Sequence, residues 1–162
     1  MWNRKEAVRF LKLSLVLSTA VFFTIVAFNN LVDYGSNYEF VRHVLMMDTT
    51  FEGNSLMWRA IDSSLIHNIF YWIIILWEIL IAIILWISGI KLLSKRKKVY
   101  EMGITKGVVG LTFSLLLWFL AFITVGGEWF VMWQSSVWNG QDAAFRMFVI
   151  NGLTLLYLFF KE

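Results

Sequence analysis

Residues 69–90 read IFYWIIILWEILIAIILWISGI, a run of 22 residues in which Glu78 is the only formally charged residue. An α-helix needs about 20 mainly apolar residues to cross a hydrocarbon core roughly 30 Å thick. This run therefore predicts a membrane-spanning helix. Three more apolar stretches, at 13–28, 107–127 and 143–160, have similar character. We predict four membrane-spanning helices, at about residues 10–29, 65–91, 106–128 and 142–160.

The composition supports a membrane protein. Of the 162 residues, 59% are hydrophobic, against roughly 45–50% in soluble domains. We predict one membrane domain over residues 1–162, with an all-α fold arranged as a four-helix transmembrane bundle. The chain has no cysteine, which excludes disulfides, thiolate metal ligands and a thiol nucleophile.

Positive charges are distributed unevenly along the chain. The N-terminal segment and the connection between the second and third helices hold ten Lys and Arg residues, whereas the other two connections hold only Arg42 and Arg59. Cytoplasmic loops carry the excess of Lys and Arg. Four spans then place both termini in the cytoplasm. Because these basic residues adjoin apolar segments, they fit orientation and contact with anionic lipid, and we expect no nucleic-acid partner.

The connection between the first and second helices is long. It covers about 40 residues, too many for a simple turn. Apolar residues at 40, 41, 44 and 45 have helical spacing, which predicts a short amphipathic helix over Tyr38–Met47. We expect a structured outer segment at about residues 30–64 that lies on the membrane or over the mouth of the bundle.

Glu78 lies nine residues inside its apolar run, at a depth of roughly 14 Å. An ionised carboxylate is expensive there. It could carry a proton or bind a ligand, or it could be a protonated carboxyl that hydrogen-bonds a neighbouring helix and fixes packing. Asn151 in the fourth helix and the Trp118 indole in the third fall at roughly the same depth.

Other polar residues gather towards the outer side. Arg146 lies near the outer end of the fourth helix, where it could anchor the helix at the interface or pair with an acid of an outer loop. A set in the first outer connection could bind a headgroup, a quinone ring, a peptide or a partner subunit, or could form an internally satisfied network. Its candidate binding residues are Asn30, Asp33, Arg42, His43, Asp48 and Arg59. We predict no catalytic residue, metal site or cofactor, because no GxSxG, HExxH or phosphate-loop motif occurs.

Three motifs in the outer connection carry a family resemblance: FNNLVDYGSN (28–37), FVRHVLMMDTTF (40–51) and WRAI (58–61). With them the chain resembles, over nearly its whole length, a bacterial family of small integral membrane proteins of unknown function (domain of unknown function 2165). The resemblance implies a location in the bacterial inner membrane. It implies no activity.

The sequence favours a non-enzymatic accessory or assembly subunit of an inner-membrane complex, because the chain is small and lacks catalytic motifs. Its partners would then be the lipid bilayer and either another membrane protein or a second copy of itself. The alternative is a small proton-coupled transporter, or a lipid- or quinone-binding protein, that uses Glu78. An enzyme acting on lipid or quinone at the outer rim would need Asp33, His43, Asp48 and Arg59 to converge.

Overall fold

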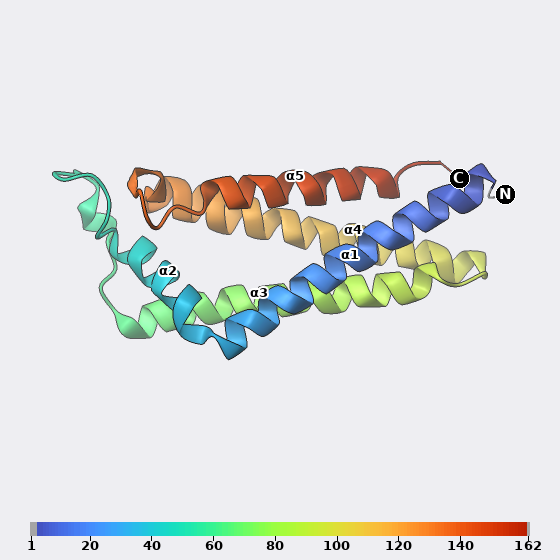
Figure 1. Cartoon of the computed structure of the whole chain (residues 1–162), viewed down its shortest axis with the longest axis horizontal. Helices are drawn as coiled ribbons and strands as arrows, with labels where there is room; N and C mark the ends of the chain where they lie inside the picture. The colour runs from blue at the N-terminus through green and yellow to red at the C-terminus, as the bar shows by residue number, and fades with distance from the viewer. Residues whose placement is uncertain (1–2, 162) are drawn as a thin grey trace.

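The computed structural model describes residues 3–161, which contain helices and loops but no strand (Figure 1). The α-helices are α1 (Arg4–Val32), α2 (Tyr34–Met46), α3 (Ser64–Leu92), α4 (Lys97–Leu116) and α5 (Gln141–Leu158). A π-helix, η2 (Leu117–Trp129), continues α4 without a break. Two short 3-10 turns, η1 (Met57–Arg59) and η3 (Met132–Gln134), complete the described chain.

The long helices α1, α3, α4–η2 and α5 run lengthwise, and α1 crosses α3 at an angle (Figure 1). Helix α2 lies at one end of the bundle, called here the α2 end. The described ends of the chain and the loop between α3 and α4 lie at the opposite end, called here the terminal end (Figure 1). The bundle therefore has two chemically different ends.

Three helices are long and apolar enough to cross a membrane: α1, α3 and the continuous α4–η2. The fourth long helix, α5, has 18 residues and includes Gln141, Asp142 and Arg146. These polar residues lower its hydropathy below that of the other three. The predicted all-helical fold is therefore confirmed, whereas the predicted four-helix transmembrane bundle is confirmed only as far as three candidate spans.

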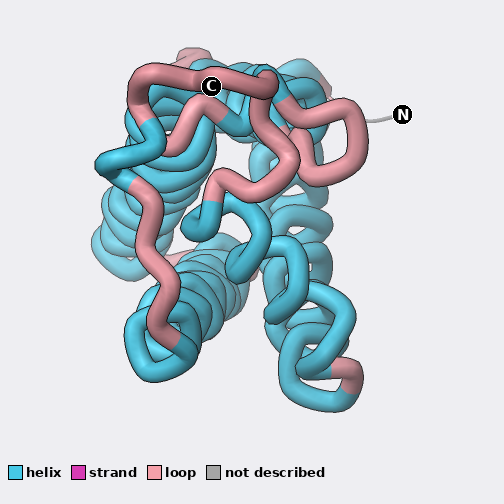
Figure 2. Tube along the Cα trace, turned by 90° about the vertical axis from the view of Figure 1, so that its left-hand side faces the viewer, coloured by secondary structure: helices cyan, strands magenta, loops and turns pink. Residues whose placement is uncertain are grey.

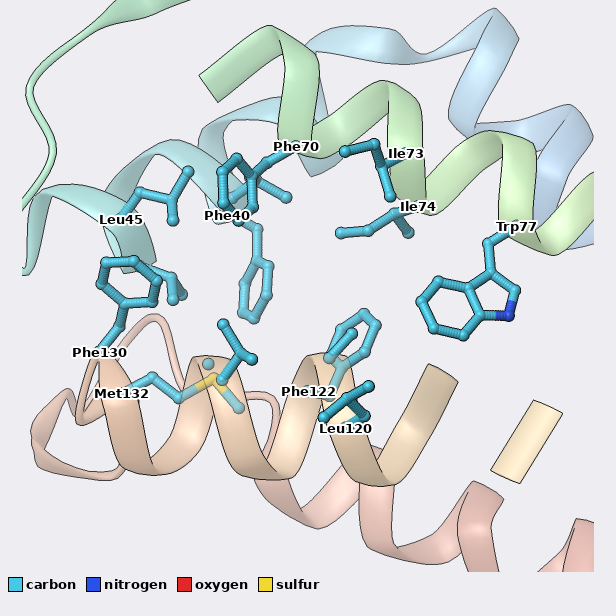
Figure 3. Close-up of a pocket in the computed structure, with 15 residues that line it drawn as sticks. Phe40, Leu45, Phe70, Ile73, Ile74, Trp77, Leu120, Phe122, Phe130 and Met132 are labelled. Carbon is cyan, nitrogen blue, oxygen red and sulfur yellow. The ribbon is translucent and has the colours of Figure 1, made fainter. Parts of the chain in front are cut away.

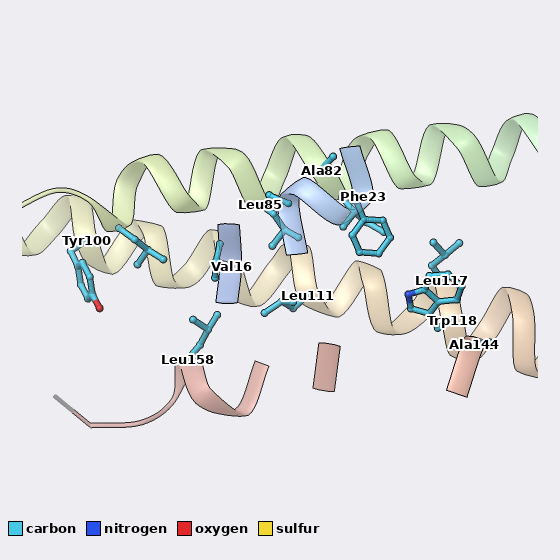
Figure 4. Packing of buried hydrophobic residues seen from close by; sticks show 13 residues of the cluster. Val16, Phe23, Ala82, Leu85, Tyr100, Leu111, Leu117, Trp118, Ala144 and Leu158 are labelled. Atoms are coloured by element: carbon cyan, nitrogen blue, oxygen red, sulfur yellow. The ribbon is translucent and has the colours of Figure 1, made fainter. Parts of the chain in front are cut away.

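Four long helices meet in one apolar core. Val16 of α1, Leu85 of α3, Leu111 of α4 and Leu158 of α5 are buried together near its middle (Figure 4). Close approach of α3 and α4 depends on small residues. A Cβ atom built on Gly103 would lie 3.0 Å from the backbone nitrogen of Leu92, and the Ser88 hydroxyl donates to the Gly103 carbonyl over 2.7 Å. This small-residue contact is typical of helix pairs in membranes.

The thirteen-residue π-helix η2 differs from the straight α-helix expected through residue 128. The Thr124 hydroxyl donates to the carbonyl of Phe119, and the amide of Phe130 donates to that of Val125, both across five residues. Most π-helices are single turns, and they often occur at functional sites. Trp118 and Phe122, four residues apart, lie on the same side of the helix with their ring centroids 5.0 Å apart.

The outer segment is structured and covers the α2 end (Figure 2). The amphipathic helix is longer at its start than expected and begins at Tyr34; it ends where Met47 adopts a left-handed conformation with φ 54°. Asn30 belongs to α1, which runs from Arg4 to Val32 and exceeds the expected range at both ends. Residues 47–63 are tied down by backbone and side-chain hydrogen bonds, including Ile61 N to Leu45 O (2.8 Å) and Thr49 to Ser135 (2.8 Å).

Candidate functional site

Polar side chains from α1, α2 and α3 form a hydrogen-bonded chain inside the bundle. Asn30 Nδ2 donates to Glu78 Oε2 over 2.6 Å, and Asn37 Nδ2 donates to Asn30 Oδ1 over 2.6 Å. The Tyr71 hydroxyl donates to the backbone carbonyl of Asn30 over 3.2 Å. Only Asp33 separates α1 from α2, so the chain turns sharply there and brings Asn37 back to Asn30.

Glu78 lies at the midpoint of α3, fourteen residues from each end. Its side chain is buried, with an exposed fraction of 2%. Within residues 3–161 it forms no ion pair, and Asn30 supplies its one hydrogen bond, to Oε2. Its second carboxyl oxygen, Oε1, accepts no hydrogen bond from residues 3–161. A carboxyl at this depth with a free oxygen is costly to leave unsatisfied.

A cavity of about 180 Å³ lies beside this chain of side chains, and Glu78, Asn30, Asn37 and Tyr71 all line it. We call it the polar cavity. Trp118 also lines it, and the Trp118 indole nitrogen is buried without a hydrogen-bond partner in the described chain. Buried polar groups in proteins are nearly always paired. The Trp118 nitrogen is too deeply buried to face the open space, so the unsatisfied group that the polar cavity offers is the carboxyl of Glu78.

A second pocket of about 230 Å³, called here the apolar pocket, lies between α2, α3 and η2 (Figure 3). Hydrocarbon and aromatic side chains line it. Ile73 and Leu120, on its rim, are about half exposed, so the pocket opens on the side of the bundle. Phe40 and Phe122 line both spaces, with stacked rings whose centroids are 6.5 Å apart. The two spaces are thus adjacent.

Helix α2 is held over the polar cavity by tyrosines. The Tyr34 hydroxyl donates to Asn68 Oδ1 over 2.7 Å, and its ring packs edge-on against Tyr71 with centroids 4.7 Å apart. Burial raises the pKa of the Tyr34 hydroxyl, which keeps it protonated as a donor. This contact fixes α2 to α3.

The structure places Asn151 and Arg146 away from Glu78. Asn151 Nδ2 donates to Ser114 Oγ over 2.6 Å between α5 and α4, while Asn151 Oδ1 is buried without a partner in residues 3–161. Arg146 is exposed on α5 and forms no ion pair with any described residue. Neither residue lines the polar cavity.

The remaining candidates in the outer segment form local contacts. Asp33 accepts from Ser36, Arg42 pairs with Glu39 (2.7 Å), and His43 Nδ1 contacts Asp48 Oδ2 (2.7 Å). The hydrogen bond with Glu39 raises the pKa of Arg42. Arg59 instead reaches the end of η2, so the candidates form separate small groups. Among them only Asn30 joins Glu78.

Arg59 ties the outer segment to η2. Its Nη1 donates to the Trp129 carbonyl over 3.2 Å, and its guanidinium lies over the rings of Trp58 and Trp129, at 5.2 and 4.6 Å from their centroids. Cation–π contacts of this kind each contribute about 0.5–1 kcal/mol at exposed sites. Arg59 therefore has a structural role in holding the loop.

Replacing Arg59 with alanine is expected to loosen residues 47–63 without unfolding the bundle. Hydrogen–deuterium exchange of this loop should become about ten-fold faster, because the hydrogen bond and the two ring contacts together amount to about 1.5 kcal/mol. Arg42→Ala is the matched control, since Arg42 pairs only within its own helix. Equal exchange in both variants would contradict the assigned role.

Three residues with polar groups that line the cavity were missed as site candidates: Asn37, Tyr71 and Trp118. Asn37 was one of many outer polar residues, and Trp118 was noted only for its depth. A signal was present in α3, where Tyr71, Ile75 and Glu78 follow helical spacing and all become buried. That spacing places the tyrosine hydroxyl and the carboxyl on one interior face.

Within residues 3–161, no group of three or more His, Asp or Glu side chains is placed to hold a metal ion. The long apolar helices define an integral membrane protein. The chain belongs to the family described as predicted small integral membrane protein (DUF2165), whose model matches residues 8–161. The resemblance seen in the loop motifs is thereby confirmed. Comparisons with curated proteins and with solved structures found no match.

Proposed function

We propose that this protein binds a small membrane-soluble molecule whose polar group lies in the polar cavity. The observation that supports this most directly is the carboxyl of Glu78, which lines the polar cavity and whose Oε1 accepts no hydrogen bond from residues 3–161. A polar ligand that bonds to Oε1 would remove the cost of leaving this oxygen unpaired inside a bilayer.

A purely structural role for Glu78 explains less. The hydrogen bond from Asn30 would fix α1 against α3, as the packing interpretation requires. It leaves the second carboxyl oxygen of Glu78 and a space of about 180 Å³ unexplained. An apolar cavity of about 150 Å³ is large enough to bind benzene, so the polar cavity has room for a functional group of a ligand.

We place the protein in a bacterial inner membrane with four spans and both termini in the cytoplasm. The basic residues near the terminal end support this orientation, since Lys91, Lys95, Arg96, Lys97 and Lys98 surround the α3–α4 connection. Helix α5 returns along α4–η2 to the terminal end (Figure 1), and it buries Ala144 and Leu158 in the core. The α2 end then faces outward.

An accessory role in a larger complex is the second candidate. It is favoured by large aromatic side chains left exposed at the α2 end, such as Trp58, with an exposed fraction of 71%, and Phe51. Such residues suit either the headgroup layer or a partner subunit. Proton-coupled transport is the third candidate function, and it would use Glu78 in the polar cavity.

Mass spectrometry of the gently extracted, tagged protein tests the binding proposal. The wild type is expected to carry a small molecule at near-stoichiometric amounts, and Glu78→Leu to retain about a tenth of it or less, because a hydrogen bond to a carboxylate is lost. Glu101→Leu, at an exposed carboxylate of α4, is the matched control. Finding only bulk lipid with the wild type, or equal retention by Glu78→Leu, would contradict the proposal. A stoichiometric co-purifying protein would support the accessory role.

A further inference from the structure

The polar route to Glu78 begins at the α2 end of the bundle. Asn37, which lines the polar cavity, is exposed, whereas Asn30 and Glu78 behind it are buried. Hydrogen bonds of 2.6 Å join Asn37 to Asn30 and Asn30 to Glu78. Polar groups therefore follow the cavity from an exposed position on α2 to the carboxyl near the middle of α3.

One oxygen of Glu78 faces this cavity. Oε1 accepts no hydrogen bond from residues 3–161, but, unlike the Trp118 nitrogen, it is not fully enclosed by protein atoms. It is therefore open to the space that Glu78 lines. The hydrogen bond from Asn30 holds the other oxygen, Oε2, so the carboxyl is fixed with Oε1 available to whatever enters.

The cavity is large and polar enough to hold water. A water molecule needs about 10–15 Å³ of free space and roughly two to four polar partners. The polar cavity has about 180 Å³, and Glu78, Asn30, Asn37 and Tyr71 supply polar groups to its lining. Glu78 and Tyr71, both on α3, are the titratable residues of this lining, and α1, α2 and η2 contribute none. A proton that enters the cavity therefore meets Glu78 as its one carboxyl.

Apolar packing closes the route from Glu78 towards the terminal end. Ile81 and Leu85, which follow Glu78 on α3, and Phe23 of α1 all have exposed fractions of 0%. Leu111 of α4 belongs to the same cluster (Figure 4). Leu85 lies seven residues beyond Glu78, which is roughly 10 Å along the helix. Packed protein interiors contain few voids that are large enough for water, so polar species do not pass through this layer in the conformation described.

We propose that the polar cavity is a one-sided entry path, through which water, protons and the polar part of a ligand reach Glu78 from the α2 end only. The carboxyl then exchanges its proton with the compartment that the α2 end faces, which is the outer one in the orientation proposed above. Proton-coupled transport would require a second conformation in which Phe23, Leu85 and Leu111 move apart. The route concerns access and not the identity of an occupant, so it goes beyond the proposed function.

Single-cysteine variants of the full chain test the route, since the protein has no cysteine of its own. Sealed membrane vesicles of both orientations receive 2-(trimethylammonium)ethyl methanethiosulfonate from outside. This charged reagent does not cross membranes, and where water carries it to a thiolate it forms a mixed disulfide and releases methanesulfinate. Two exposed positions report which end each preparation presents: Ser55→Cys in the loop at the α2 end, and Lys95→Cys in the connection between α3 and α4.

The thiol of Glu78→Cys is expected to react about ten-fold faster, or more, in vesicles that present Ser55→Cys than in those that present Lys95→Cys, because thiol reactivity depends on access. Leu85→Cys, on the same helix but within the apolar packing, is the matched control and should stay unmodified in both. Ile74→Cys also lines the polar cavity and keeps Glu78 in place. It should show the same preference, and it provides the measurement if Glu78→Cys does not fold.

The outcomes separate one-sided access from the other proposals. Equal reaction of the cavity thiols from both ends, faster reaction from the terminal end, or no reaction from either end would overturn it, as would modification of Leu85→Cys. If Ser55→Cys reacts only in inverted vesicles, the proposed orientation is wrong while one-sided access stands. The absence of any co-purified molecule in the extraction experiment would overturn the proposed function and leave the route unaffected.

Discussion

The Asn30→Leu variant is expected to lose about 1–3 kcal/mol of its free energy of unfolding. Asn30 is the centre of the polar chain, since it donates to Glu78 and accepts from Asn37 through its side chain. Leucine would leave the buried carboxyl of Glu78 without its partner, which costs about 1–3 kcal/mol, whereas Asn37 is exposed and its amide can bond to water. Reversible unfolding in mixed micelles, followed by circular dichroism, measures the change.

A double-mutant cycle provides the control. In Asn30→Leu/Glu78→Leu both partners are apolar, which can be nearly neutral in a buried site. The double variant is therefore expected to recover at least half of the lost stability. If it is less stable than Asn30→Leu alone, the hydrogen bond between Asn30 and Glu78 does not explain the effect.

The Gly103→Leu variant is expected to lose more than about 3 kcal/mol of unfolding free energy, or to fail to assemble α4 against α3. Its Cβ would meet the backbone nitrogen of Leu92 at 3.0 Å and the Cβ of Lys91 at 3.1 Å. A backbone nitrogen and a Cβ atom can move only if the helix backbone moves, unlike the end of a flexible side chain. Overpacking typically costs 1–3 kcal/mol, and separation of the helices would also break the Ser88 hydrogen bond. Thermal unfolding in detergent measures this loss of stability.

Gly35→Leu is the matched control for that substitution. Gly35 also lies in a helix, and a Cβ there meets nothing within 4 Å. Leucine should stabilise α2 by about 1 kcal/mol or less, since glycine is a poor helix former. A similar loss of stability in both variants would contradict the claim that close contact between α3 and α4 at Gly103 causes the effect.

The sequence was sufficient to predict the helical class and the family, because long apolar runs and the loop motifs are strong local signals. The fourth predicted span is confirmed only as a helix, since α5 contains Gln141, Asp142 and Arg146 and is not among the three candidate spans. The sequence also contains no sign that η2 winds as a π-helix, since its residues are compatible with an ordinary helix. Winding depends on contacts with neighbouring helices, which a single sequence does not display.

The site was predicted in part. Glu78 is conspicuous because a carboxyl interrupts an apolar run, and Asn30 was among the outer polar candidates. Their pairing depends on α1 continuing past Asn30 and on the sharp turn at Asp33. Neither feature has a length or composition signal, so depth arithmetic suggested Asn151 as a neighbour of Glu78, whereas the structure pairs Asn151 with Ser114.

The direct connection of α1 to α2 concentrates the polar cavity in a short stretch of sequence. Val26, Asn30, Asn37, Phe40 and Val41 supply half of the residues that line it, and all lie within sixteen positions of one another. In evolutionary terms, substitutions within one short segment can change half of the cavity lining. The other half, Tyr71, Ile74, Glu78, Trp118 and Phe122, lies on α3 and η2, so the segment can vary while the buried carboxyl is retained.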